Sequence, residues 1–108
     1  MPTSHYSYRV TWSPEDNEYV ASCAEFPSLS WLDEDEVEAL RGIRNLVAET
    51  VEDMRANGEP IPQPLADREY SGKFVVRTTP DVHRRLTIEA AEAKVSLNRY
   101  INSKLTAS

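Results

Sequence analysis

The stretch GKFVVRTTPD at residues 72–81 decides how the rest of the chain is interpreted. Residues 73–78 alternate between two faces, which is the period-2 pattern of a half-buried strand. Thr79 follows as a helix N-cap, with Pro80 at the first helical position and Asp81 in the first turn. A lone strand is unstable in water, and the short segment after it is too small to fold as a monomer. This C-terminal part is therefore expected to dimerise.

The two faces of the predicted strand differ in chemistry. Lys73, Val75 and Arg77 lie on one face, which is largely basic. Phe74, Val76 and Thr78 lie on the other face, which is largely apolar. Pairing of two such strands buries the apolar face and presents the basic face twice.

Two helical patterns follow the strand and are separated by a tight turn near Lys94. Ser96 is the predicted N-cap of the second helix. The inner face of the first helix and the apolar side of the second are formed by Val82, Leu86, Ala90, Ala93, Leu97, Tyr100, Ile101 and Leu105.

This order of strand, helix, turn and helix resembles the ribbon-helix-helix DNA-binding fold, in which paired strands of two subunits enter the major groove. The resemblance implies that Lys73, Val75 and Arg77 face the groove, where Arg77 suits guanine and Val75 a thymine methyl. The start of the second helix would hold a phosphate through Ser96 and the amides of Leu97 and Asn98. The implied dimer core consists of Phe74, Val76, Leu86, Leu97 and Ile101.

The N-terminal half has its own pattern, beginning with alternating aromatic and apolar residues from Tyr6 to Trp12. Further strands are predicted at residues 19–24 and 29–32, which gives an antiparallel meander. The acidic run at residues 33–36 opens a long helix that Asn57 and Gly58 end. The helix is expected to cover the aromatic face of the sheet with a stripe of Val37, Leu40, Ile43, Leu46, Val47, Val51 and Met54.

Three prolines between residues 60 and 64 exclude a helix and predict an extended linker. The predicted domains are residues 1–64 and 72–108, joined by a linker at 65–71. The charge changes sign across this boundary: residues 1–71 carry five arginines and fifteen acidic residues, whereas residues 72–108 carry seven basic and three acidic residues. The resulting net charges of −10 and +4 suggest a basic partner for the first part and nucleic acid for the second.

The N-terminal half resembles the HicB family of antitoxins at several motifs, which are Tyr8-Arg9-Val10, residues 14–21 (PEDNEYVA), Glu25-Phe26-Pro27, Glu38-Ala39-Leu40 and residues 57–62 (NGEPIP). A ribbon-helix-helix tail is one of the C-terminal forms of that family. The resemblance implies an α+β protein in which a partial RNase H-like sheet, covered by one helix, precedes the DNA-binding module. Ser28 and the helix entry at residues 33–36 depart from the family pattern.

The implied function is that of an antitoxin, which neutralises a small ribonuclease toxin of the HicA type through the N-terminal domain. Its C-terminal domain would repress transcription of its own operon by binding operator DNA as a homodimer, or as a tetramer formed through the N-terminal sheets. An alternative is a stand-alone ribbon-helix-helix regulator whose N-terminal domain senses a ligand or drives oligomerisation.

No enzymatic activity, cofactor or metal site is predicted. The acidic side chains at Glu15, Asp16 and Glu18 fall in a turn, and those at residues 33–36 start a helix, where carboxylates have structural roles. His5 is expected in a frayed terminus, and Cys23 is the only cysteine. No apolar run is long enough for a membrane span, and no secretory signal precedes the first strand. These features together predict a cytoplasmic protein.

Overall fold

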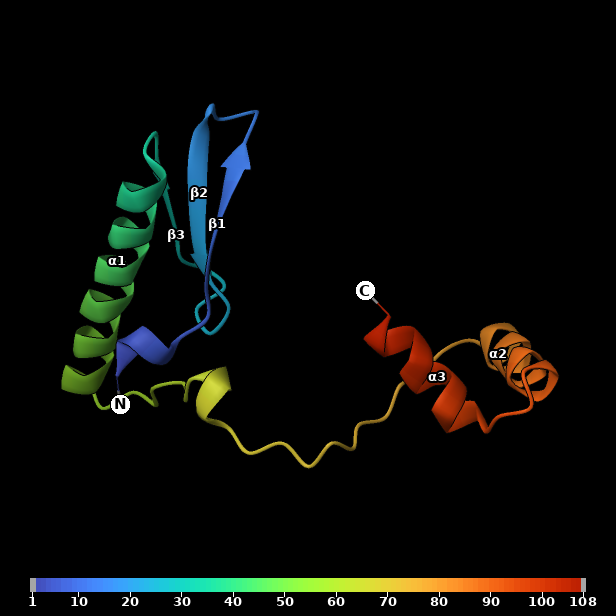
Figure 1. Ribbon diagram of the computed structural model, residues 1–108. Helices are drawn as coiled ribbons and strands as arrows, with labels where there is room; N and C mark the ends of the chain where they lie inside the picture. Colours follow the sequence, from blue (N-terminus) through green and yellow to red (C-terminus); the bar gives the residue numbers. More distant parts are fainter. Residues whose placement is uncertain (1, 108) are drawn as a thin grey trace. The chain divides into compact units, whose positions relative to one another are not determined.

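The computed structural model describes residues 2–107 and divides the chain into two compact units, Met1–Tyr70 and Ser71–Ser108 (Figure 1). The class is α+β, as the sequence predicts. The first unit contains η1 (Thr3–His5), β1 (Tyr8–Ser13), β2 (Glu18–Cys23), β3 (Ser30–Asp33), α1 (Glu36–Ala56) and η2 (Leu65–Asp67), and the second contains α2 (Pro80–Glu92) and α3 (Leu97–Thr106).

The sheet of the first unit is the predicted antiparallel meander, in the order β1-β2-β3. Val10 of β1 pairs with Ala21 of β2, which in turn pairs with Trp31 of β3. The tight turn between β1 and β2 is fixed by a hydrogen bond of 2.9 Å from the Ser13 hydroxyl to the Asp16 carboxylate. Among the described residues, β1 and β3 have no further strand beside them, so each forms an edge of the sheet.

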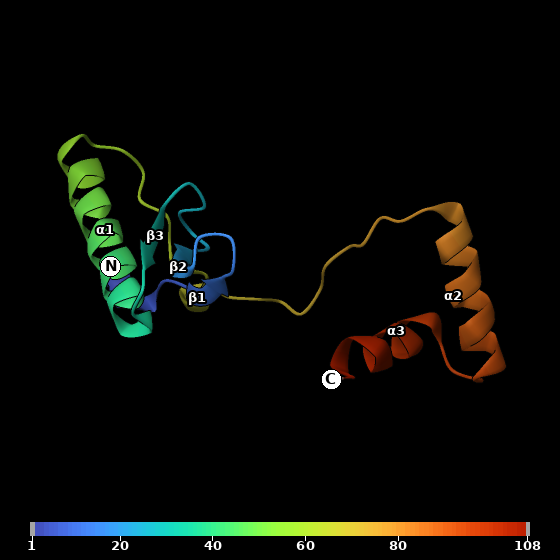
Figure 2. The same ribbon diagram turned by 90° about the horizontal axis from the view of Figure 1, so that it is seen from above.

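Helix α1 lies across one face of the sheet (Figure 2). Its buried apolar side chains are those of Ala39, Ile43, Val47 and Val51. They pack on Ala21 and Cys23 of β2 and on the aromatic rings of Tyr6 and Phe26. Ile43, Val47 and Val51 belong to the apolar stripe that the sequence predicts, and Ala39 is a small residue beside it. The core of the first unit is therefore complete within the unit.

Both ends of α1 are capped by local hydrogen bonds. The Asp35 carboxylate accepts a hydrogen bond of 3.0 Å from the Glu38 N–H, which satisfies one free amide of the first turn. At the other end Gly58 has a φ of 68°, which glycine adopts without steric cost. Glu59 then donates its N–H to the Met54 carbonyl at 2.9 Å, completing a Schellman motif.

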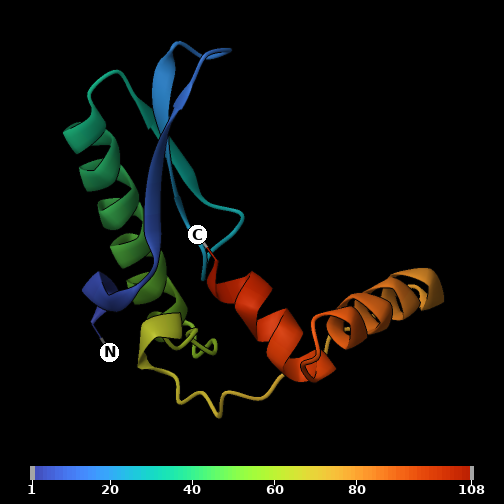
Figure 3. The same ribbon diagram turned by 45° about the vertical axis from the view of Figure 1, so that its right-hand side comes forward.

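The proline-rich segment after α1 is extended, as predicted, but it is docked on the first unit. Pro64 is fully buried, and the Tyr6 hydroxyl donates a hydrogen bond of 2.6 Å to the Pro62 carbonyl. The residues that follow, which the sequence predicts at the start of the linker, form the 3-10 helix η2 beside η1 (Figure 3). The chain therefore leaves the first unit only after Asp67.

The second unit consists of α2 and α3, joined by a turn from which the helices leave in different directions (Figure 2). Thr79 caps α2 by accepting the Val82 N–H at 3.3 Å, with Pro80 at the first helical position, and Ser96 caps α3. Ala90 is the one buried residue among those described in this unit. No strand is assigned at residues 72–79 of the single chain.

Candidate nucleic-acid interface

Residues 72–79 form an extended segment whose side chains are exposed. The exposed fractions are 73% for Phe74, 85% for Val75 and 72% for Val76. Three consecutive apolar side chains in water are unfavourable, because each buried one would contribute about 1.5–3 kcal/mol to stability. The segment is thus an unpartnered apolar surface.

The backbone of the same segment is also unpartnered. The peptide groups of residues 74–78 form no hydrogen bond with any described residue, while Lys73 bonds only the Ser71 hydroxyl, at 3.1 Å through its N–H. Free N–H and C=O groups along an extended segment are the template on which another strand pairs. The geometry of the segment fits a strand that is completed by a second chain.

The two cations of the predicted groove face stay free of acidic partners. Lys73 and Arg77 are exposed, and neither forms an ion pair with the residues that the structure describes. The basic side chains of α2 differ, since Arg84 pairs with Asp81 and Arg85 with Glu89. Lys73 and Arg77 thus remain available to an anionic ligand.

The start of α3 has amide groups of the kind that hold a phosphate. The Ser96 hydroxyl accepts the Arg99 N–H at 3.1 Å, so this oxygen already serves the helix cap. The N–H groups of Leu97 and Asn98 donate to no described residue, because they lie in the first turn of the helix, before the first intrahelical donor. The helix dipole makes both groups favourable to an anion.

The predicted dimer-core residues of the two helices are only partly buried in the single chain. Leu86, Leu97 and Ile101 are half-buried between α2 and α3, and the Tyr100 hydroxyl joins the helices through a hydrogen bond of 3.1 Å to Glu89. Leu105 remains 64% exposed. One helix pair therefore leaves part of its own apolar surface exposed.

Two acidic side chains at the start of α1 accept hydrogen bonds from the backbone. The Asp33 carboxylate accepts the Asp35 N–H at 2.9 Å, and Asp35 in turn caps α1. No cluster of three or more His, Cys, Asp or Glu residues within residues 2–107 is arranged to hold a metal ion. None of the helices that the structure describes is long and apolar enough to cross a membrane.

Glu25 is a residue whose importance the sequence pattern does not reveal. Its carboxylate accepts hydrogen bonds from the Ser7 N–H and the Leu65 N–H, both at 2.9 Å, and from the Cys23 thiol at 3.5 Å. Burial raises the pKa of the carboxyl, but these hydrogen bonds outweigh burial and leave the pKa below its ordinary value. Glu25 therefore ties the proline-rich segment to the sheet.

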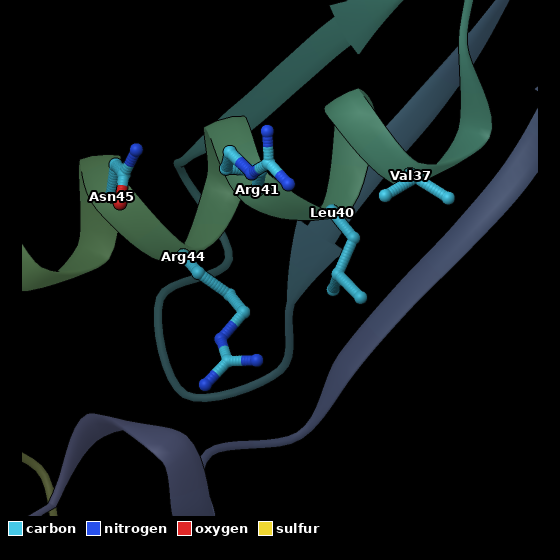
Figure 4. Close-up of a pocket in the computed structure, with 5 residues that line it drawn as sticks. All are labelled: Val37, Leu40, Arg41, Arg44 and Asn45. Carbon is cyan, nitrogen blue, oxygen red and sulfur yellow. The ribbon is translucent and has the colours of Figure 1, made fainter.

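The first unit also has an open hollow of about 340 Å³ beside α1, lined by Val37, Leu40, Arg41, Arg44 and Asn45. Leu40 and Arg44 extend from the same side of the helix (Figure 4). The Arg44 guanidinium lies 6.0 Å from the centre of the Tyr8 ring in β1, in a cation–π contact. Arg41 instead forms an ion pair of 2.8 Å with Glu38.

Comparison with known proteins gives one match. The model of the HicB family matches residues 56–105, from the end of α1 through most of α3. No curated protein and no solved structure matches the chain. The match includes the NGEPIP motif and the two C-terminal helices but not the motifs of the sheet. Over these residues, which are just under half of the chain, the protein is similar to the HicB family.

Proposed function

We propose that the protein is a cytoplasmic antitoxin that neutralises a small HicA-like ribonuclease through its first unit and represses its own operon through its second. The observation that carries the DNA-binding part is the segment at residues 72–79. It combines unpaired peptide groups, exposed apolar side chains and two free cations in an order that suits an intersubunit ribbon.

Dimerisation of the second unit follows from how little it buries. A polypeptide of this size has too small a core to be stable alone, and the described part of the unit has a single buried residue, Ala90. Pairing two segments at residues 73–78 would satisfy the free peptide groups. The same pairing would cover Phe74 and Val76 with Leu86, Leu97 and Ile101 of both copies.

DNA binding is supported by the position of the charges. The net charge of residues 72–108 is +4, and the paired segments would bring two copies of Lys73 and Arg77 onto one face. A two-stranded ribbon fits the major groove, where an arginine bonds guanine at two acceptors. The free amides at the start of α3 would hold the flanking phosphates.

Toxin binding by the first unit is supported by its charge. With a net charge of −10 over residues 1–71, this unit suits the positive surface with which a ribonuclease binds RNA. A role in binding rather than catalysis fits the carboxylates, because Asp33, Asp35 and Glu25 are engaged in hydrogen bonds that hold the fold.

The first test is the substitution Arg77→Ala in the full chain. Loss of one bidentate arginine–guanine contact lowers operator affinity by about 1–3 kcal/mol, or roughly 5- to 150-fold, and relaxes sequence preference at one position. Both effects are measured by titrating the protein into labelled operator DNA taken from the region upstream of its gene. Arg84→Ala is the matched control, because Arg84 pairs with Asp81 on α2. Equal affinity of the parent and Arg77→Ala would remove Arg77 from the interface.

The second test separates the two activities. A fragment of residues 1–71 contains the complete core of the first unit and should fold. It is expected to bind the toxin encoded beside its gene and to have no measurable affinity for operator DNA. Should the folded fragment fail to bind that toxin while the full chain succeeds, the toxin contact lies in the second unit. Absence of toxin binding by either protein would favour a stand-alone regulator.

A further inference from the structure

The edge strand β1 has few of the features by which sheets protect an edge. It is six residues long, contains no proline or bulge, and carries a single charged side chain, Arg9. The opposite edge, β3, has only four residues and ends in Asp33. Short or charged strands resist pairing with another chain, whereas a long apolar edge invites it. An unprotected edge at β1 therefore calls for a partner.

The backbone of β1 shows which groups the partner would bond. The Ser7 carbonyl accepts the Ala24 N–H at 2.9 Å, so the peptide groups of residue 7 point toward β2. Because directions alternate along an antiparallel ladder, the N–H and C=O groups of Tyr8, Val10 and Trp12 point outward. These three residues also carry the side chains on the α1 side of the sheet.

We propose that β1 pairs antiparallel with β1 of a second copy, about a two-fold axis at Val10, and joins two sheets into one of six strands. This register satisfies all the outward peptide groups of β1 and sets Tyr8 opposite the partner's Trp12. An isologous contact of this kind closes on itself. The pairing does not depend on toxin or DNA binding.

A second copy fits this edge because the side chains are self-complementary. Trp12 is 48% exposed and contacts Tyr19 of its own chain only edge-on, with ring centres 5.0 Å apart. In the paired sheet it would reach the ring of Tyr8 and the Arg44 guanidinium, which has no acidic partner among the described residues. A cation held over two aromatic rings is favourable.

The same register fills the hollow beside α1 and keeps like charges apart. Leu40 and Arg44, which line the hollow, extend from one side of α1 (Figure 4), and the partner's Trp12 would approach that side. The acidic turns that contain Glu15 and Asp16 lie at opposite ends of the joined sheet, because the strands are antiparallel. The net negative charge of the unit is thus no obstacle to this contact.

The test uses the fragment of residues 1–71, whose core is complete, and two proline variants. In Val10→Pro the lost N–H points outward, so the β1–β2 ladder is kept; Leu32→Pro removes the matching outward N–H at the β3 edge. Sedimentation over a dilution series should give the mass of two chains for the parent and Leu32→Pro, and of one chain for Val10→Pro. The proposal would be overturned if the parent fragment had the mass of one chain, or if the Val10→Pro variant had the mass of two chains.

A second measurement tests the register in the full chain and keeps the proposal falsifiable if a proline variant unfolds. Pairing about Val10 sets Arg9 opposite the partner's Thr11 in a non-hydrogen-bonded pair, at a Cα distance of roughly 4.5 Å that a disulfide can bridge. Both side chains are exposed. The double variant R9C/T11C should form interchain disulfides on mild oxidation, whereas R9C and T11C alone should not. Equal cross-linking of single and double variants, or none in the double variant, would contradict the register.

Discussion

At the scale of single residues, Glu25 holds three segments together through the Ser7 and Leu65 amides and the Cys23 thiol. Its pKa lies below the ordinary value in the folded state, since the hydrogen bonds outweigh the effect of burial. The stability that it contributes is therefore present above the pKa of an unfolded glutamate and is lost as the pH falls through the lower pKa of the fold.

Replacement of Glu25 by glutamine should make the stability of the first unit less dependent on pH. At neutral pH we expect a loss of about 1–2 kcal/mol, because hydrogen bonds to a charged acceptor become neutral ones. In acid the parent and the variant should converge. Urea unfolding of both proteins from pH 7 down to pH 3 measures the difference, with the exposed Glu34→Gln as control. A constant difference at all pH values would contradict this role of the carboxylate.

Lys94 occupies the left-handed region, with a φ of 59°, in the turn after α2. Its N–H bonds the Ala91 carbonyl at 3.0 Å and Val95 bonds Ala90 at 3.1 Å, so the turn is a Schellman motif with lysine where glycine is usual. Lys94→Gly should raise the stability of the second unit by about 0.5–1 kcal/mol, because it removes the left-handed strain. Gly58→Ala should lower the stability of the first unit, because residue 58 has a φ of 68°. Thermal unfolding at fixed protein concentration measures whether stability rises in the first variant and falls in the second.

At the scale of elements, Gly42 sets how closely α1 approaches β3. A methyl group at this position would lie 2.1 Å from the Trp31 ring nitrogen, so the indole would have to move. Helix propensity alone would make Gly42→Ala stabilising by about 1 kcal/mol. We expect the lost packing of Trp31 to exceed this gain and to give a net destabilisation of about 1–2 kcal/mol. Tryptophan fluorescence and urea unfolding measure the two effects, with Asn45→Ala on the same helix as control.

The elements were predictable from sequence where one local signal dominates. The caps at Thr79 and Ser96 and the glycine at residue 58 set helix ends, and the residue pattern placed the three strands of the first unit to within two residues. The docking of residues 59–67 was missed, because three prolines indicate an extended backbone without showing what it contacts. The hydrogen bonds that hold this segment come from Tyr6 and Glu25, which are remote in sequence. His5, expected in a frayed terminus, likewise contacts Asp67 at 2.9 Å.

The candidate site was predictable as a set of residues but not as a surface. The order of Lys73, Phe74 and Val75 indicates two faces, yet the single chain leaves all three side chains exposed, and in our proposal the second strand belongs to another copy. The groove face and the dimer core thus stay predictions. A periodic pattern can show that a strand needs a partner, but not the geometry of the pair.

At the scale of the whole molecule, the second unit should gain its structure with concentration. Its helices bury one residue among those described, so we expect their stability to depend on association. The melting temperature of an associating unit rises with concentration. We expect the helical signal of α2 and α3 to melt at lower temperature on dilution, and Phe74→Asp to remove that dependence by keeping the unit unfolded. Circular dichroism of the full chain over a wide concentration range measures this. A melting temperature of these helices that is independent of concentration would contradict an obligate dimer.

The docked segment after α1 has a consequence for reach. Because η2 ends at Asp67 and α2 begins at Pro80, only residues 68–79 can act as a linker between these elements of the two units. A dozen residues stretch to roughly 40 Å at most. If residues 59–67 were released from the first unit, the length of the linker would nearly double. In the proposed complex, the hydrogen bonds of Tyr6 and Glu25 to this segment would therefore keep a toxin bound to the first unit within about one helical turn of DNA from the second unit.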